Sequence, residues 1–159
     1  MSPRIDSASR FISASPQTVY RAFVERRAME QWLPPENMFG KMLKFDFREG
    51  GSYRMRLTYL PQEQGRGKSS EDSDEVEVRL TKIEAGRRIE QEVTFESEDS
   101  AFSGVMYMIW TFEPLDEGTL VMIRAENVPE GIRPEDHDAG LNSSLEKLAR
   151  FVEEDRRRR

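Results

Sequence analysis

Two short helical patterns come early in the chain. Ser15-Pro16 supplies a helix cap followed by proline at the first helical position, where its missing N–H is not needed. The helix that follows is expected to bury one face, made of Val19, Tyr20, Phe23 and Val24. Pro34-Pro35 is expected to end a second short helix, which carries Met29, Trp32 and Leu33.

The C-terminal segment predicts one long amphipathic helix, from about Pro134 to Glu154. Its apolar residues step by four, three and four positions, as one buried helix face requires: Leu141, Leu145, Leu148 and Val152. Acidic residues crowd its first turn and basic residues its end, which suits the helix dipole. The basic tail, 155–159, is expected to be a solvated end.

Elsewhere hydrophobic and polar residues alternate, which is typical of strands with one buried face. The expected strands cover residues 7–12, 41–47, 53–59, 76–80, 89–95, 105–112 and 120–127. Leu43, Phe45 and Phe47 define the alternation in the second strand, and Arg48-Glu49-Gly50-Gly51 is expected to turn it into the third. Residues 61–74 are polar and predict a mobile loop.

The order of these elements predicts an α+β fold. One strand, two helices, about six consecutive hairpin-connected strands and a long helix contain no βαβ alternation, so the sheet should be antiparallel, with the helices on one face. A curved sheet around a helix can leave a cavity between them, and such cavities commonly bind ligands. The length of 159 residues fits one domain, 1–159, with its core at about 7–154.

Composition narrows the possible functions. The net charge of −6 and the pI near 5.0 argue against a nucleic-acid partner, because binding phosphates requires a basic face. The chain has no cysteine, no apparent signal peptide and no run long enough to span a membrane, so we expect it in the cytoplasm.

No catalytic or metal-binding constellation stands out, and no cofactor is expected. His137 is the only histidine and is interpreted as a first-turn helix residue, without the second imidazole that most such metal sites use. Gly65-Arg66-Gly67-Lys68-Ser69 resembles part of a phosphate-binding loop, but it precedes an acidic run instead of a helix. Glu90 and Glu92 are expected on the wet side of their strand.

Apolar and aromatic side chains are the remaining signal. If the sheet curves as expected, one set of residues would line the cavity: Trp32, Phe45, Tyr53, Met55, Gln91, Phe95, Trp110, Phe112, Leu141, Leu145 and Leu148. Gln91 would be a hydrogen-bonding group among apolar walls. The alternative that these residues simply fill the core stays open for each of them.

Several segments together resemble the SRPBCC superfamily, in its branch named for the activator of Hsp90 ATPase. The segments are Asp46-Phe47-Arg48-Glu49-Gly50-Gly51-Ser52-Tyr53-Arg54-Met55, Trp110-Thr111-Phe112-Glu113-Pro114, Gly118-Thr119 and 140–148. The resemblance implies a helix-grip fold, as in START and Bet v 1-like proteins, with an apolar pocket under the last helix. Leu141 stands where related sequences usually carry tryptophan, so we expect a differently shaped pocket floor.

The sequence therefore favours a binding module for a hydrophobic or amphipathic small molecule, for instance a lipid. One alternative is a protein-partner role related to chaperone regulation and stress response, or a homodimer, for which exposed apolar residues on strand 105–112 would be evidence. The chain has no counterpart of the extra N-terminal domain of the eukaryotic Hsp90 activator, so Hsp90 activation is not expected to carry over directly. The other alternative is a cyclase-like or hydrolase-like enzyme acting in the same cavity.

Overall fold

A computed structural model describes residues 4–34, 38–60, 73–95, 100–102 and 104–157. Its elements, in chain order, are β1 (Ile5–Ile12), α1 (Pro16–Val24), α2 (Arg26–Trp32), β2 (Met38–Phe45), β3 (Ser52–Tyr59), β4 (Ser73–Glu84), β5 (Arg88–Phe95), the 3-10 turn η2 (Ser100–Phe102), β6 (Met106–Leu115), β7 (Gly118–Glu126) and α3 (Pro134–Arg157). The predicted order of elements is confirmed.

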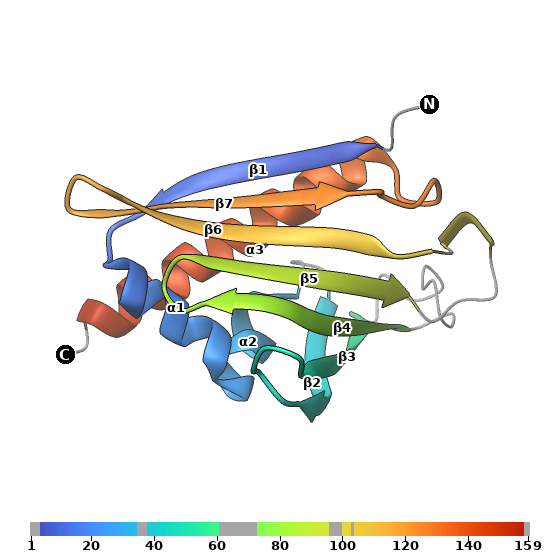
Figure 1. Ribbon diagram of the computed structural model, residues 1–159, viewed down its shortest axis with the longest axis horizontal. Helices are drawn as coiled ribbons and strands as arrows, with labels where there is room; N and C mark the ends of the chain where they lie inside the picture. Colours follow the sequence, from blue (N-terminus) through green and yellow to red (C-terminus); the bar gives the residue numbers. More distant parts are fainter. Residues whose placement is uncertain (1–3, 35–37, 61–72, 96–99, 103, 158–159) are drawn as a thin grey trace.

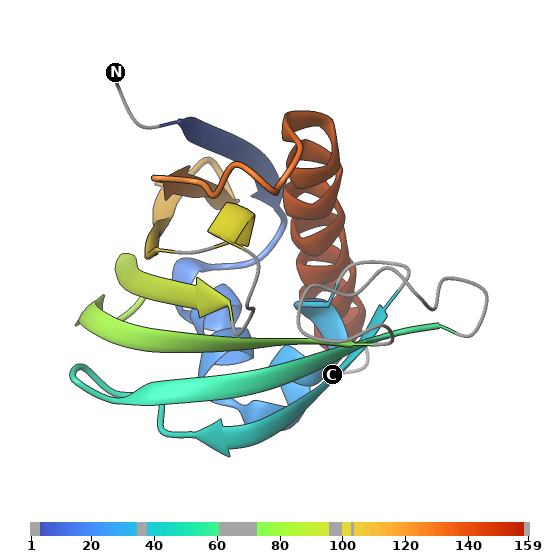
Figure 2. The same ribbon diagram turned by 90° about the vertical axis from the view of Figure 1, so that its right-hand side faces the viewer.

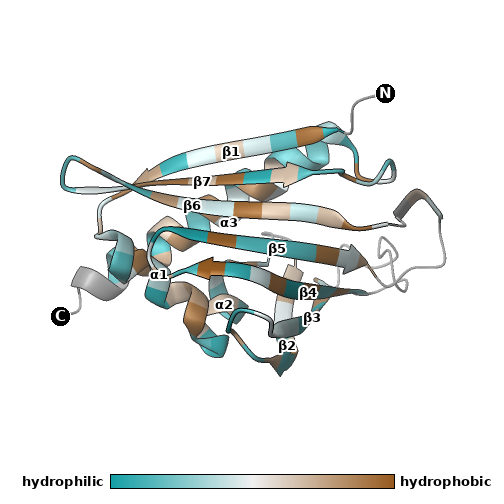
Figure 3. Cartoon of the chain, in the orientation of Figure 1, coloured by the Kyte–Doolittle hydropathy of each residue, from teal (hydrophilic) through white to brown (hydrophobic). Residues whose placement is uncertain are grey.

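The seven strands form one antiparallel sheet in the order β1-β7-β6-β5-β4-β3-β2. The sheet is curved, and α3 lies on its concave side, with α1 and α2 near the C-terminal end of α3 (Figures 1 and 2). The alternation of hydrophobic and hydrophilic residues along β4 and β5 is visible in Figure 3. This arrangement is the predicted helix-grip architecture.

Helix α1 begins as the sequence predicts, but its buried face differs slightly. The Oγ of Ser15 accepts a hydrogen bond from the backbone N–H of Thr18 at 3.2 Å, which satisfies one free N–H of the first turn. The helix buries Val19, Ala22 and Phe23. Val24 was expected on this face but is exposed, because α1 ends there and the chain turns into α2.

The alternation predicted for β2 was wrong at Leu43, whereas Phe45 and Phe47 pack against the core. The strand begins at Met38, and its pairing with β3 shifts register between Met42 and Lys44. This bulge buries Met42 and leaves Leu43 exposed, opposite to the expectation. The backbone N–H of Met42 donates instead to Glu30 Oε2 of α2, at 2.6 Å.

The turn between β2 and β3 needs both of its glycines. Gly50 has a φ of 86°, in the region that side chains with a Cβ rarely adopt. A Cβ on Gly51 would lie 2.3 Å from the carbonyl oxygen of Asp46, so no larger residue fits there. The predicted turn is confirmed, and its sequence is explained by the close approach of two backbone segments.

The ends of two predicted segments also shift. Ser73 and Asp74, expected in the loop 61–74, belong to β4, and Asp74 is buried where it accepts a hydrogen bond from the Tyr59 hydroxyl at 3.5 Å. Residues 61–72, including the glycine-rich stretch 65–69, lie outside the described residues. Helix α3 continues to Arg157, into the expected tail. None of the described helices has the length and hydropathy of a membrane span.

Candidate ligand-binding site

The aromatic residues near α1 and α2 pack against one another. The ring of Phe23 lies 4.7 Å from Trp32, 5.0 Å from Trp110 and 5.2 Å from Phe112, all edge to face. The indole N–H of Trp32 donates to the carbonyl of Ala22 at 2.9 Å. Three of the predicted lining residues thus form a closed aromatic cluster at one end of the inner face.

A second group lies where β2 ends and β3 begins. Phe45 packs near Tyr53, with ring centroids 6.2 Å apart, and stacks with Phe47. Met55 is fully buried on the same face of β3 as Tyr53. These predicted residues are therefore brought together on the inner face of the sheet.

Gln91 lies at the centre of the inner face. The strand register places it between Met108 on β6 and Leu80 on β4, and Ala125 on β7 continues the row beyond Met108. The residue is only 3% exposed, and its amide Nε2 has no hydrogen-bond partner. Buried amide groups are nearly always paired, so this donor is a marked exception.

Tyr53 is the ionisable neighbour of this amide. Burial raises the pKa of its phenol well above the ordinary value of 10.0, and the nearby Gln91 side chain opposes part of that rise. The phenol is therefore neutral at physiological pH. The interaction with Gln91 does not satisfy Nε2, which lacks a partner at standard hydrogen-bond geometry.

Some apolar side chains of the inner face are only partly buried. Leu57 on β3, Phe95 on β5 and Met108 on β6 are among those that pack against the core in this way. Met108 stands directly beside Gln91 in the register, so solvent reaches the inner face next to the unpartnered amide. Glu90 and Glu92 alternate with Gln91 and therefore point to the opposite face of β5, as predicted.

Helix α3 covers this face with an apolar stripe. Leu141, Leu145 and Leu148 are at most 5% exposed and belong to the same buried cluster as the sheet residues. Two side chains fix the helix to the end of α2: Ser144 Oγ donates to the Leu33 carbonyl at 2.8 Å, and Lys147 Nζ donates to the Pro34 carbonyl at 2.6 Å.

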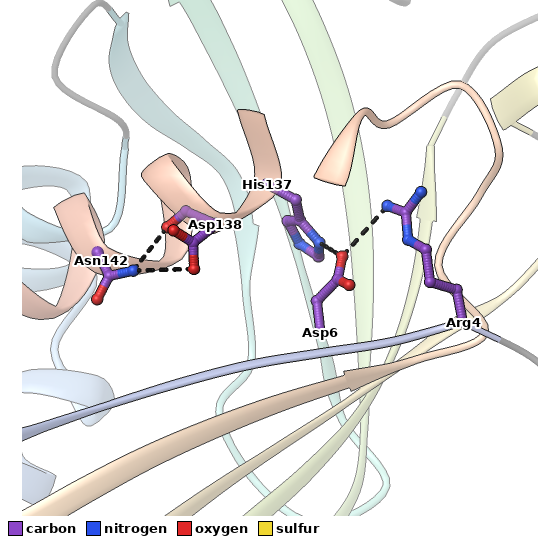
Figure 4. A network of polar contacts seen from close by, with 5 residues as sticks. All are labelled: Arg4, Asp6, His137, Asp138 and Asn142. Carbon is purple, nitrogen blue, oxygen red and sulfur yellow. Dashed lines mark hydrogen bonds and ion pairs between the residues drawn. The ribbon is translucent and has the colours of Figure 1, made fainter. Parts of the chain in front are cut away.

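The start of α3 is held to β1 by a polar network that the sequence did not reveal. His137 Nδ1 hydrogen-bonds Asp6 Oδ2 at 2.7 Å, and Arg4 reaches the same oxygen at 3.2 Å (Figure 4). Asp6 and His137 are 131 positions apart, so only the fold brings them together. The residues described contain no group of three metal-ligating side chains. The bond to Asp6 fastens the start of α3 to β1.

Comparison with known proteins identifies the family. A family model described as "Activator of Hsp90 ATPase homolog 1-like protein" matches residues 13–153. The chain belongs to this family. A crystal structure of a protein from Chromobacterium violaceum is 33% identical, covers 94% of this chain and 96% of its own, and superposes with a TM-score of 0.81.

More distant solved structures share the fold of the family. A solution structure from Staphylococcus epidermidis is 20% identical, with a TM-score of 0.74, and covers 98% of this chain and 93% of its own. An AHSA1-like protein from Aeromonas hydrophila is 16% identical, with a TM-score of 0.70, over 94% of this chain and 92% of its own. The comparison with curated proteins gave no match.

Family membership supports a module that binds a ligand or regulates an Hsp90-type ATPase, without naming a ligand. Within this AHSA1-like chain, the inner face offers hydrogen bonding and apolar contact. Gln91 is the polar side chain in its central row, and the neighbouring phenol of Tyr53 is neutral.

Proposed function

We propose that this AHSA1-like protein binds a hydrophobic or amphipathic small molecule between the inner face of the sheet and α3. The observation that carries the proposal is the buried, unpartnered amide of Gln91 among apolar side chains. Leaving such a donor unpaired costs about 1–3 kcal/mol, which a well-packed core avoids by using an apolar residue. A bound molecule that accepts from this amide would remove that cost.

The packing of the neighbouring residues supports the same proposal. The aromatic cluster around Phe23 closes one end of the inner face, whereas Leu57, Phe95 and Met108 leave the other side partly open. Of the predicted lining residues, we therefore assign ligand contact to Gln91, Tyr53, Phe95 and Leu145. In this proposal, Trp32 and Phe112 do not contact the ligand but pack behind the residues that do.

An NMR titration with a panel of lipids and aromatic metabolites tests the proposal. We expect saturable shifts of the Gln91 side-chain amide, the Trp110 indole and the Leu145 methyl groups. Native mass spectrometry of the same mixtures should show a one-to-one adduct. If the panel causes no saturable shift at the inner face, the proposed function is wrong.

A second candidate, self-association or binding to a protein partner, is favoured by the outer face. Tyr107, Met122 and Phe11 are each more than 40% exposed, and with Ile109 they follow a diagonal across β6, β7 and β1. Exposed apolar residues grouped in this way mark contact surfaces. Size-exclusion chromatography with light scattering tests homodimer formation: Y107S/M122S should shift a dimer to monomer, and K41S on β2 should not.

A further inference from the structure

We propose that the molecule bound in this site is uncharged at its buried end and carries an oxygen that accepts a hydrogen bond from Gln91 Nε2. Ketones, esters and amides have this chemistry, whereas carboxylates and plain hydrocarbons do not. The inference rests on the proposed function. It narrows the class of ligand by two properties of the inner face, the kind of hydrogen bond it lacks and the charge it can accept.

The missing hydrogen bond requires an acceptor. An amide nitrogen carries two N–H donors and accepts no hydrogen bond, so a partner for Nε2 of Gln91 must present a lone pair. The flanking residues of the row, Met108 and Leu80, offer no oxygen, and the nearby phenol oxygen of Tyr53 does not reach Nε2 at hydrogen-bond geometry. A carbonyl oxygen of the ligand supplies the lone pair and needs no proton in return.

The strands around Gln91 offer no cation to a buried anion. Among the described residues that β3 to β7 turn to this face, none is lysine, arginine or histidine. The basic side chains that α3 brings toward the sheet are already engaged, His137 with Asp6 and Lys147 with the Pro34 carbonyl, and Arg10 on the edge strand β1 is exposed. A carboxylate buried here without a cation would have to become protonated.

The side chains in the row of Gln91 can adapt to ligands of different shapes. Ala125 presents only a methyl group at its end, and Met108 between them is a flexible thioether that is partly exposed. The hydrogen bond to Gln91 therefore fixes the carbonyl of the ligand, and the adaptable side chains contact its apolar part.

Three matched probes test the inference: methyl decanoate, decanoate and undecane, each competing with the neutral dye Nile red at neutral pH. Methyl decanoate should bind about five- to tenfold more tightly than undecane, because one hydrogen bond to Gln91 changes the affinity by about this factor. Decanoate should bind most weakly, and its affinity should rise as the pH falls through the pKa of its carboxyl group.

The variant Q91M should lower the affinity for methyl decanoate to that for undecane. E92M, on the opposite face, should leave the difference between these two affinities unchanged. In the unmodified protein, the Gln91 side-chain amide signals should move downfield with the ester and stay in place with the alkane. This measurement stands even if Q91M fails to fold.

The outcomes separate the two proposals. If ester and alkane bind equally well and Q91M changes neither, or if decanoate binds as tightly as the ester, the ligand class is wrong but the binding function stands. The proposed function itself fails if none of the probes displaces the dye or binds directly, and if the panel of lipids and aromatic metabolites also causes no saturable NMR shift.

Discussion

At the scale of single residues, Gln91 stands apart from its surroundings. Its neighbours in the row are apolar, and the fold leaves its Nε2 without a partner. An apolar residue of the same shape at this position would make the ligand-free protein more stable. The residue that we assign to binding is therefore one that the folded state does not need for its own stability.

The substitution Q91M should stabilise the protein by about 1 kcal/mol, because it removes an unpaired buried donor and keeps the side-chain volume nearly constant. Urea denaturation followed by circular dichroism measures the difference, with E92M as the control on the outer face. A loss of stability of similar size would mean that Gln91 has a partner in the folded protein.

Tyr53 provides a second prediction at this scale. The pKa of its phenol is raised in the folded protein, so only the unfolded chain ionises near the ordinary value of 10.0. The neutral phenol therefore makes its full contribution to the free energy of unfolding below about pH 10, and this contribution is lost as the pH rises further.

The variant Y53F should lose less stability than the unmodified protein between about pH 10 and 11.5, measured by urea denaturation at each pH. Burial also raises the pKa of Tyr20, so part of the alkaline loss should remain in the variant. Y107F, which changes an exposed ring, is the control. Equal slopes for Y53F and the unmodified protein would contradict the prediction.

At the scale of elements, α3 is held by polar bonds at both sides of its apolar stripe. Ser144 and Lys147 bind carbonyl groups at the end of α2, Asp6 binds His137, and Glu153 Oε2 accepts from the backbone N–H of Ser13 at 3.0 Å. These contacts keep the helix in place over an inner face that is only partly covered. In the proposed function, they fix the helix above the bound molecule.

Adjacent serines on α3 allow a matched comparison. S144A should destabilise the protein by about 1 kcal/mol, because it removes the bond to the Leu33 carbonyl. S143A should be neutral or slightly stabilising, because the buried Oγ of Ser143 has no partner. Thermal unfolding of both variants measures the contrast, and a larger loss for S143A would refute this account of the helix contacts.

At the scale of the whole molecule, the sheet and α3 share one hydrophobic cluster. Leu145 is 1% exposed and lies in the middle of the apolar stripe. The variant L145A should lose about 2–5 kcal/mol of unfolding free energy, and the space it creates should admit bulkier esters. Chemical denaturation and the Nile red competition measure the two effects. E146A on the exposed face of α3 is the control, and a loss below about 1 kcal/mol would show that Leu145 is not packed.

Local patterns in the chain determined most of the architecture. The period of hydrophobic residues was sufficient for the helices and for the strands, because one buried face imposes a repeat that can be read along a single segment. The glycine turn and the cap at Ser15 were also visible, since both depend on neighbours within a few residues.

The tertiary structure decided what the local patterns could not express. The bulge in β2, the burial of Asp74 beside Tyr59 and the bond between Asp6 and His137 all depend on which distant segments meet. The separation of the aromatic cluster from the row of Gln91 also depends on which distant segments meet. Alternation predicted that Gln91 points inward, but only the register of three strands shows that its amide meets apolar neighbours and lacks a partner.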